Sequence, residues 1–235
     1  FLENISFNLR LEFLEDIILK RPSFSFFEII ADNWFSNGPH HEKLLKIRND
    51  YELYFHCVGM NLGGSDPIDT SYLKTIKILK DKFNPIHISD HLCFQSHNNK
   101  HHHDLLPIPF NDKYLTNTAD RINQIQDFLK EPILIENLSY YIEYESSTMT
   151  EFEFLNELQR KTGCQYLLDL NNLWVNHINL GISLEKSIDS INLNNVKEIH
   201  FAGPEYTDGL YLDTHGAYPS TELFKLFIKY KKEFK

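Results

Sequence analysis

The sequence is poor in cysteine and has no long hydrophobic run. Its 235 residues include only Cys57, Cys93 and Cys164, and no pair has the C-x-x-C spacing of a thiolate zinc site. Three cysteines are few and odd in number, which also argues against a disulfide framework. We therefore expect a reducing, cytoplasmic location. No apolar run approaches the ~20 residues of a membrane span, and no signal peptide opens the sequence. We therefore expect no membrane partner.

Basic residues are also scarce. The chain has 33 acidic and 23 basic side chains, a formal charge of −10, which is the wrong sign for binding phosphates. Nucleic acid is therefore excluded as the expected partner. The 42% hydrophobic content is enough for one large core. We expect a single domain over residues 1–235, trimmed at its ends because the sequence starts at Phe1 and stops at Lys235 after a helical pattern.

Apolar segments alternate with segments of helical spacing along the chain. Strands are predicted at 5–10, 26–30, 52–57, 86–89, 132–135, 165–170 and 196–201. Helices are predicted at 11–20, 41–48, 71–82, 112–130, 150–161, 183–191 and 221–230. This alternation, without evident antiparallel hairpins, predicts parallel βαβ units. The fold class is therefore α/β, a TIM-type (β/α)₈ barrel whose eighth strand is missing from the given sequence.

Ionisable residues fall at the carboxyl ends of the predicted strands. Glu136 follows a strand that reads as buried on both faces, and an uncompensated ionised Glu there would cost several kcal/mol. The other strands end near these residues: His56, Asp90 with His91, Asp169 and His200. Such ends form one rim of a parallel barrel, where active sites are built. In a later loop, Asp213 and His215 are two residues apart and project to the same side.

Each of these residues has a structural alternative. A lone His at a strand end is more often hydrogen-bonded than metal-bound, Asn171 and Asn172 could form turns, and Glu28 could pair with Arg10. Together, however, they predict a metal site, and imidazole mixed with carboxylate suits iron, manganese or zinc. The candidate ligands are His56, His91, Glu136, Asp169, His177, His200, Asp213 and His215. They are too many for one ion, so two or three ions are expected, with Glu136 able to bridge a pair.

Eight segments of the sequence resemble those of the multinuclear non-haem iron-dependent oxidases, the family of the methanobactin-biosynthesis B protein. The segments are 26–34, 55–59, 89–92, 104–107, 135–137, 168–172, 198–200 and 213–216, in order through nearly the whole chain. The resemblance implies a TIM barrel related to xylose isomerases and endonuclease-four-type enzymes, holding two or three irons. It also implies O₂-dependent oxidation of a residue, often cysteine, in a ribosomally made precursor peptide, with a separate partner protein that presents the leader.

The resemblance also implies a distribution of ligands among three irons. His56, His91 and Glu136 resemble the ligands of one iron, and Glu136, Asp169 and His200 those of a second. Asp213 and His215, with His177 or Asn172, resemble a third site. The chain departs from the family pattern at Asp90, where Glu is usual, and it ends before the carboxylate ligand of the eighth strand.

We predict that Glu136, His91 and Asp90 are catalytic. Residues expected to support the ligands or bind substrate are Glu28, Asn33, Asn61, Asp104, Asn137 and Asn172. The expected mechanism is binding of a peptide thiolate to Fe(II), which lowers the thiol pKa, followed by O₂-dependent removal of hydrogen from the cysteine β-carbon. The alternatives are a zinc-dependent hydrolase of the AP-endonuclease kind, a sugar isomerase, and a non-catalytic barrel that binds a peptide or partner.

Overall fold

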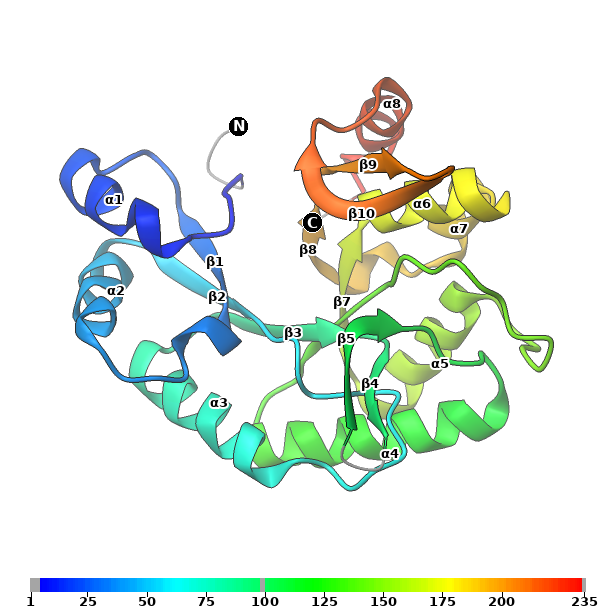
Figure 1. Cartoon of the computed structure of the whole chain (residues 1–235), viewed down its shortest axis with the longest axis horizontal. Helices are drawn as coiled ribbons and strands as arrows, with labels where there is room; N and C mark the ends of the chain where they lie inside the picture. Colours follow the sequence, from blue (N-terminus) through cyan, green and yellow to red (C-terminus); the bar gives the residue numbers. More distant parts are fainter. Residues whose placement is uncertain (1–4, 98–99, 234–235) are drawn as a thin grey trace.

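The computed structural model describes residues 5–97 and 100–233, and a curled parallel sheet forms its centre (Figure 1). In order along the sheet, the strands are β1 (Phe26–Ile30), β2 (Glu52–His56), β3 (His87–His91), β6 (Leu134–Glu136), β7 (Gln165–Asp169) and β8 (Val196–His200). All neighbours are parallel. Helices cover the outer side of the curl. The predicted fold class is confirmed: this is an incomplete TIM barrel.

All but one of the described helices lie close to where the apolar spacing predicts them. They are α1 (Leu14–Lys20), α2 (Pro39–Asp50), α3 (Thr70–Phe83), α4 (Asp112–Leu129), α5 (Glu151–Thr162), α6 (Leu170–Leu180), α7 (Leu184–Ser190) and α8 (Thr221–Tyr230). Local signals set their ends. For α5, Thr150 and Glu153 form a reciprocal capping box, and Gly163 ends the helix with φ of 71°. None of the helices in the described ranges is long and apolar enough to cross a membrane.

Two sequence-based expectations about the elements are wrong. The predicted strand at 5–10 is reduced to an isolated parallel bridge between Asn8 and Glu28. Helix α6 was not predicted, because Asn171 and Asn172 read as turn formers. In the structure, the Asp169 side chain accepts a hydrogen bond from the backbone N–H of Asn172 and caps this helix directly after the strand.

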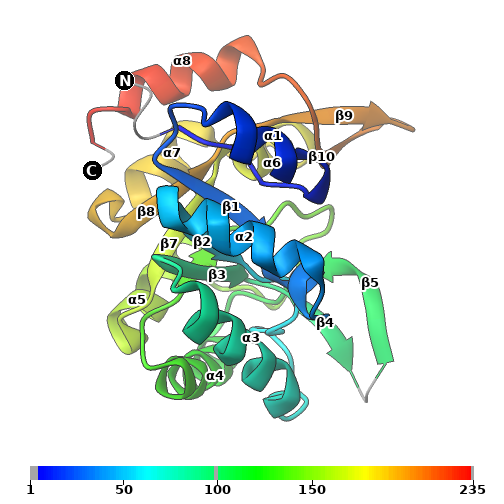
Figure 2. The same cartoon turned by 90° about the vertical axis from the view of Figure 1, so that its left-hand side faces the viewer.

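The expectation of no antiparallel hairpins is also wrong. Strand β4 (Phe94–His97) pairs with β5 (Lys100–Leu106), and β9 (Gly203–Thr207) pairs with β10 (Leu210–Ala217). Figure 2 shows the β4–β5 hairpin projecting from the barrel. The β9–β10 turn is Asp208–Gly209, with φ of 52° and 92°, a dipeptide typical of tight hairpin turns. Strand β10 carries Asp213 and His215.

The sheet separates an apolar layer from the polar strand ends. Residues that face the helices, such as Phe27, Leu53 and Ile88, are completely buried. On the opposite face, Phe26 and Tyr54 stack at 4.4 Å near the start of their strands. Because side chains alternate along a strand, the same inner face presents polar residues toward the strand ends. The site therefore lies on an apolar floor.

Candidate metal centre

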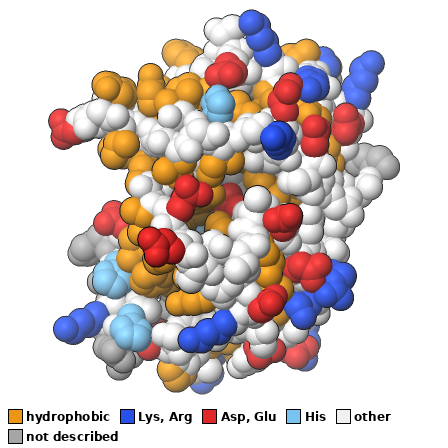
Figure 3. Space-filling view, turned by 90° about the vertical axis from the view of Figure 1, so that its right-hand side faces the viewer, with side chains coloured by type: hydrophobic (Ala, Val, Ile, Leu, Met, Phe, Trp, Pro, Cys, Tyr) orange, Lys and Arg blue, Asp and Glu red, His pale blue; other side chains and the backbone are white. Residues whose placement is uncertain are grey.

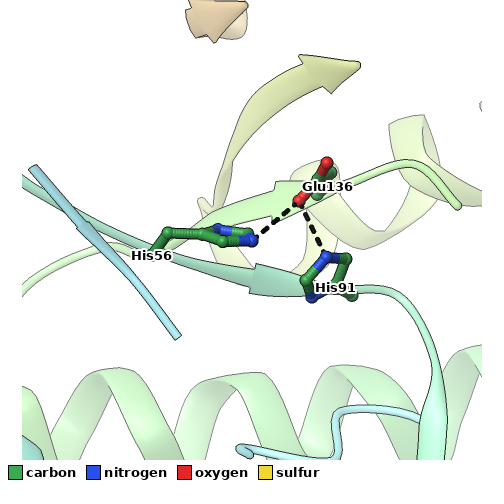
Figure 4. A group of neighbouring side chains, drawn as sticks. All are labelled: His56, His91 and Glu136. Atoms are coloured by element: carbon green, nitrogen blue, oxygen red, sulfur yellow. Dashed lines mark ion pairs between the residues drawn. The ribbon is translucent and has the colours of Figure 1, made fainter. Parts of the chain in front are cut away.

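His56, His91 and Glu136 meet at the ends of β2, β3 and β6. Nε2 of His56 lies 3.3 Å from Glu136 Oε2, and Nε2 of His91 lies 3.2 Å from the same oxygen. Figure 4 shows both rings aimed at this carboxylate. All three residues are buried, and their ligand atoms lie within 4.8 Å of one another. Two imidazoles and a carboxylate thus converge as they would around one ion.

Neighbouring groups orient the two rings. The Ser89 hydroxyl donates to the carbonyl of Phe55, so it accepts at 2.8 Å the Nδ1–H of His56, which leaves His56 Nε2 with its lone pair toward Glu136. Burial lowers the pKa of His56 more than the charge of Glu136 raises it, which favours this neutral form. His91 Nδ1 lies 3.5 Å from Asp90 Oδ1.

Asp90 lies behind His91 on the other face of β3. Its carboxylate is fully buried and accepts hydrogen bonds from the backbone N–H groups of Met60, at 2.8 Å, and His91, at 2.6 Å. Because it faces away from the ligand atoms, Asp90 holds the β2–α3 loop and the His91 backbone. In this structure Asp90 therefore contacts the backbone beside the cluster and not the ligand atoms that face Glu136.

A second group gathers at the ends of β7, β8 and the β9–β10 hairpin. Nε2 of His215 lies 3.0 Å from both Asp169 Oδ2 and Asp213 Oδ1. Nδ1 of His200 lies 3.5 Å from the same Asp169 oxygen and 3.2 Å from Glu136 Oε1. Glu136 therefore faces both groups, one through each carboxylate oxygen. This is the arrangement required of a bridging carboxylate.

The charges in this second group are strongly coupled. Burial lowers the pKa of His215, but its hydrogen bonds to Asp169 and Asp213 raise it to about 10. Burial would raise the pKa of Asp169, yet the contacts of its carboxylate with His200 and His215 keep that pKa below the usual range. The Asp169 carboxylate is thus ionised and attracts positive charge.

A third group lies beside His200 on the inner face of the barrel. Glu28 on β1 and Glu198 on β8 have carboxylate atoms within 4.8 Å of each other and of a His200 nitrogen. Burial would raise the pKa of Glu28, but the charge and hydrogen bond of His200 lower it to about 2. Burial, then the charge of Glu28, raise the pKa of Glu198 well above normal. Glu198 was not a predicted site residue, although it stands two residues before His200, on the same face of the strand.

Several buried polar atoms at the strand ends have no hydrogen-bond partner among the described residues: Glu136 Oε2, His91 Nδ1, Asn171 Oδ1 and Asn172 Oδ1. An unpaired buried acceptor costs about 1–3 kcal/mol. A bound cation would satisfy Glu136 Oε2 in particular, because two imidazole nitrogens already face it. The donor set of imidazole, carboxylate and amide oxygen, without thiolate, suits iron, manganese or zinc.

Asparagine side chains hold the loops that follow β6 and β7. The Asn172 amide donates to the carbonyl of Asn137 at 3.0 Å, and the Asn176 amide donates to that of Leu138 at 2.8 Å. Asn171 was predicted only as a turn former, but it is fully buried and donates to Asp213 Oδ1 at 2.5 Å. Asn171 therefore joins the second group through Asp213, a contact that the sequence analysis missed.

The structure does not bring some expected residues to the cluster. His177 Nδ1 hydrogen-bonds the carbonyl of Ile182 at 2.7 Å, and its Nε2 faces Glu222 at 4.0 Å, because helix α6 turns its C-terminal half away. Asn33 and Asp104 are exposed, Asp104 on hairpin strand β5. Asn61 is buried with φ of 54° and binds the backbone of Gln95 and the hydroxyl of Ser96, so it fixes the base of the β4–β5 hairpin.

Comparison with known sequences gives one consistent family. The model of a family described as RiPP precursor modification enzyme MbnB/TglH/ChrH matches residues 4–235. A UPF0276 protein of Acaryochloris marina is 38% identical over 218 residues, which are 93% of this chain and 79% of the relative. A UPF0276 protein of Psychromonas ingrahamii is 36% identical over 233 residues, 96% of this chain and 81% of the relative.

Solved structures show the same fold at low sequence identity. Endonuclease IV from Thermus thermophilus superposes with a TM-score of 0.59 at 14% identity, covering 94% of this chain and 86% of that chain. D-allulose 3-epimerase from a Methylomonas species gives 0.58 at 11% identity, covering 98% and 81%. At such low identities the similarity shows only that the fold is the same.

Proposed function

The chain belongs to the MbnB/TglH/ChrH family of RiPP precursor modification enzymes, which act on ribosomally made precursor peptides, and on that premise we propose that it is an iron-dependent oxidase of such a peptide. The membership confirms the family recognised from the sequence motifs. The finer parts of the proposal are two or three irons, dioxygen as co-substrate and a cysteine as the modified residue.

The position of Glu136 is the observation that carries this proposal. One oxygen faces His56 and His91, and the other faces His200, which also contacts Asp169. A single hydrolytic ion would need about three protein ligands, whereas this arrangement offers two complete sets that share one carboxylate. A multinuclear centre therefore fits the residues better than a mononuclear one.

We assign the ligands from the geometry. His56, His91 and Glu136 would hold one iron, and Glu136, Asp169 and His200 a second. Asp213, His215 and the amide oxygen of Asn171 would hold a third ion, with Asp169 close by. When bound, the irons would bind the substrate thiolate and activate dioxygen, chemistry that no protein side chain supplies.

The chain's own residues fix and shield this centre. Glu136 is 2% exposed and Asp169 fully buried, so the ligands at the floor are held rigidly and kept from bulk water. Asp213 and His215 are more open, with side chains 23% and 39% exposed. Substrate would therefore approach from the β9–β10 hairpin side.

A peptide fits the surroundings better than a nucleic acid does. Figure 3 shows a side of the molecule that is hollowed, with acidic side chains around the hollow. The formal charge of −10 opposes binding of phosphates. We propose that a precursor peptide enters between the hairpins, and that a separate protein presents its leader, as the family resemblance implies.

Metal analysis and an oxygen test decide the proposal. We expect about two or three irons per chain, and turnover of a cysteine-containing precursor that needs both dioxygen and the presenting partner. A Glu136→Gln variant should lose iron and activity together while it stays folded, whereas Glu143→Gln, on an exposed loop, should keep both. Zinc with phosphodiester hydrolysis, or normal turnover without oxygen, would contradict the proposal.

A further inference from the structure

Glu28 and His200 lie on the two edge strands of the sheet, yet their side chains meet. Strand β1 is one edge and β8 the other, with four strands between them in the order of the sheet. Glu28 Oε1 nevertheless lies 2.9 Å from His200 Nε2, a hydrogen bond between residues 172 positions apart. The curl of the barrel therefore brings the first strand of the sheet against a candidate metal ligand on its last strand.

The other ring nitrogen of His200 faces the metal centre. Nδ1 lies 3.2 Å from Glu136 Oε1 and 3.5 Å from Asp169 Oδ2. In this structure both nitrogens face carboxylates, Nε2 that of Glu28 and Nδ1 that of Glu136. An imidazole that binds a metal ion is neutral, with one N–H and one lone pair, so the partner of one nitrogen decides what the other can do. A hydrogen kept on Nε2 by Glu28 would leave the lone pair on Nδ1.

We propose that Glu28 is a positioning residue that holds the hydrogen of His200 on Nε2 and thereby commits Nδ1 to the second iron. The inference rests on the proposed function and deepens it, because it names the ligating atom and the residue that selects it. A carboxylate behind a histidine ligand also fixes the ring plane and strengthens the ligand. Glu28 thus acts on the second site through His200.

The N-terminal segment holds Glu28 in place. The carbonyl of Glu28 accepts a hydrogen bond from the N–H of Leu9 at 2.7 Å, and Asn8 pairs with Glu28 as an isolated parallel bridge. The Asn8 amide also approaches Glu28 Oε2 at 3.4 Å. The carboxylate is thus oriented from both sides, by Asn8 and by His200. The segment before α1 would therefore help to orient a residue at the metal centre.

The alternative is an additional ion among Glu28, Glu198 and His200, whose ligand atoms lie close enough to bind one. Such an ion would take the lone pair of Nε2 and leave a hydrogen on Nδ1. His200 could then not bind an ion together with Glu136 and Asp169. The two arrangements are mutually exclusive, and they differ in the nitrogen that is bound and in the effect of removing Glu198.

The experiment uses zinc-loaded protein labelled with ¹⁵N in histidine. Long-range ¹H–¹⁵N spectra of the wild type should show His200 bound through Nδ1 with its hydrogen on Nε2, and His200→Gln identifies its signals. Removal of a group that orients a metal ligand typically costs 10–100-fold in metal affinity. Glu28→Ala should weaken one ion by about that factor, whereas Glu28→Gln, whose amide oxygen still accepts the N–H, should restore most of the affinity.

Two further variants separate the alternatives. Glu198→Gln should leave the number of bound ions unchanged, and Glu52→Gln, an exposed residue at the start of β2, is the matched control for a lost carboxylate. Binding through Nε2, or loss of a whole ion in Glu198→Gln, would overturn the inference while the proposed function stands. A wild-type protein that binds no ion would overturn both.

Discussion

The side chain of Asn137 pairs with both backbone groups of Asp169. Its amide donates to the Asp169 carbonyl at 2.9 Å, and its oxygen accepts the Asp169 N–H at 2.8 Å. This pair continues the ladder between β6 and β7 beyond the last residues that they pair through their backbones. It fixes the spacing between Glu136, which precedes Asn137, and Asp169. The two carboxylates that would share the second iron are therefore joined through an amide that touches neither ion.

The first prediction tests this connection. Asn137→Ala removes both hydrogen bonds and leaves two buried backbone groups unpaired, at about 1–3 kcal/mol for each group. We expect a lower free energy of unfolding in urea, and weaker binding of the second ion than of the ion at His56 and His91. Asn194→Ala, at an exposed position, is the control. Full metal affinity in Asn137→Ala would show that the backbone alone sets the spacing.

A second prediction separates two histidines that the family resemblance places in the same third site. His215 contacts Asp169 and Asp213, whereas His177 hydrogen-bonds the carbonyl of Ile182. His215→Ala should therefore lose one ion, and His177→Ala should keep every ion. Elemental analysis of the two purified variants measures this directly. Equal losses in both would mean that helix α6 rearranges when metal binds.

A third prediction concerns Asn171. Both Asn171 and Asn172 have an unpaired Oδ1, but only Asn171 hydrogen-bonds Asp213, which is why we propose it for the third ion, whereas Asn172 donates to the carbonyl of Asn137. Asn171→Ala should weaken only the third ion, and Asn171→Asp should restore binding because it keeps an oxygen ligand. Asn172→Ala should instead lower the stability, seen as a lower melting temperature. A reversal of these phenotypes would assign the ligand to Asn172.

Five of the residues that the sequence analysis found share one property. His56, His91, Glu136, Asp169 and His200 directly end apolar strands, so the period of the strand and the parallel topology are enough to place them together. The structure adds what depends on side-chain pairing across elements. Asn171 is recognised only when hairpin β9–β10 brings Asp213 beside it, although the Asp208–Gly209 turn of that hairpin is visible in the sequence.

Glu28 and Glu198 show the other limit of sequence reasoning. The distance between these two residues depends on how far the sheet curls, because they lie on its two edge strands. The pattern of apolar residues sets which face of a strand is buried, but it does not set the distance between strands that are not paired. Asn8 is a similar case, since a single bridge replaces the predicted strand.

The last prediction concerns stability and pH through a carboxyl group away from the metal centre. Glu151, at the start of α5, is buried, and its Oε1 accepts the N–H of Leu138 at 2.9 Å. Burial raises its pKa from 4.5 to about 8 in the folded protein, although the hydrogen bond from Leu138 opposes the shift. Between these pH values the folded state keeps a proton that the unfolded state has released.

The contribution of Glu151 to the free energy of unfolding should therefore fall as pH rises from 4.5 toward 8 and should level off above that range. Glu151→Gln keeps the acceptor and cannot ionise, so it should gain stability relative to the wild type as pH increases, by at most about 1.4 kcal/mol per pH unit. Urea unfolding of both proteins at pH 5 and pH 8 measures the difference. The control is Glu143→Gln, in the exposed part of the preceding loop, whose stability should change with pH as that of the wild type does. If Glu151→Gln also stayed parallel to the wild type, Glu151 would ionise in the folded state as readily as in the unfolded state.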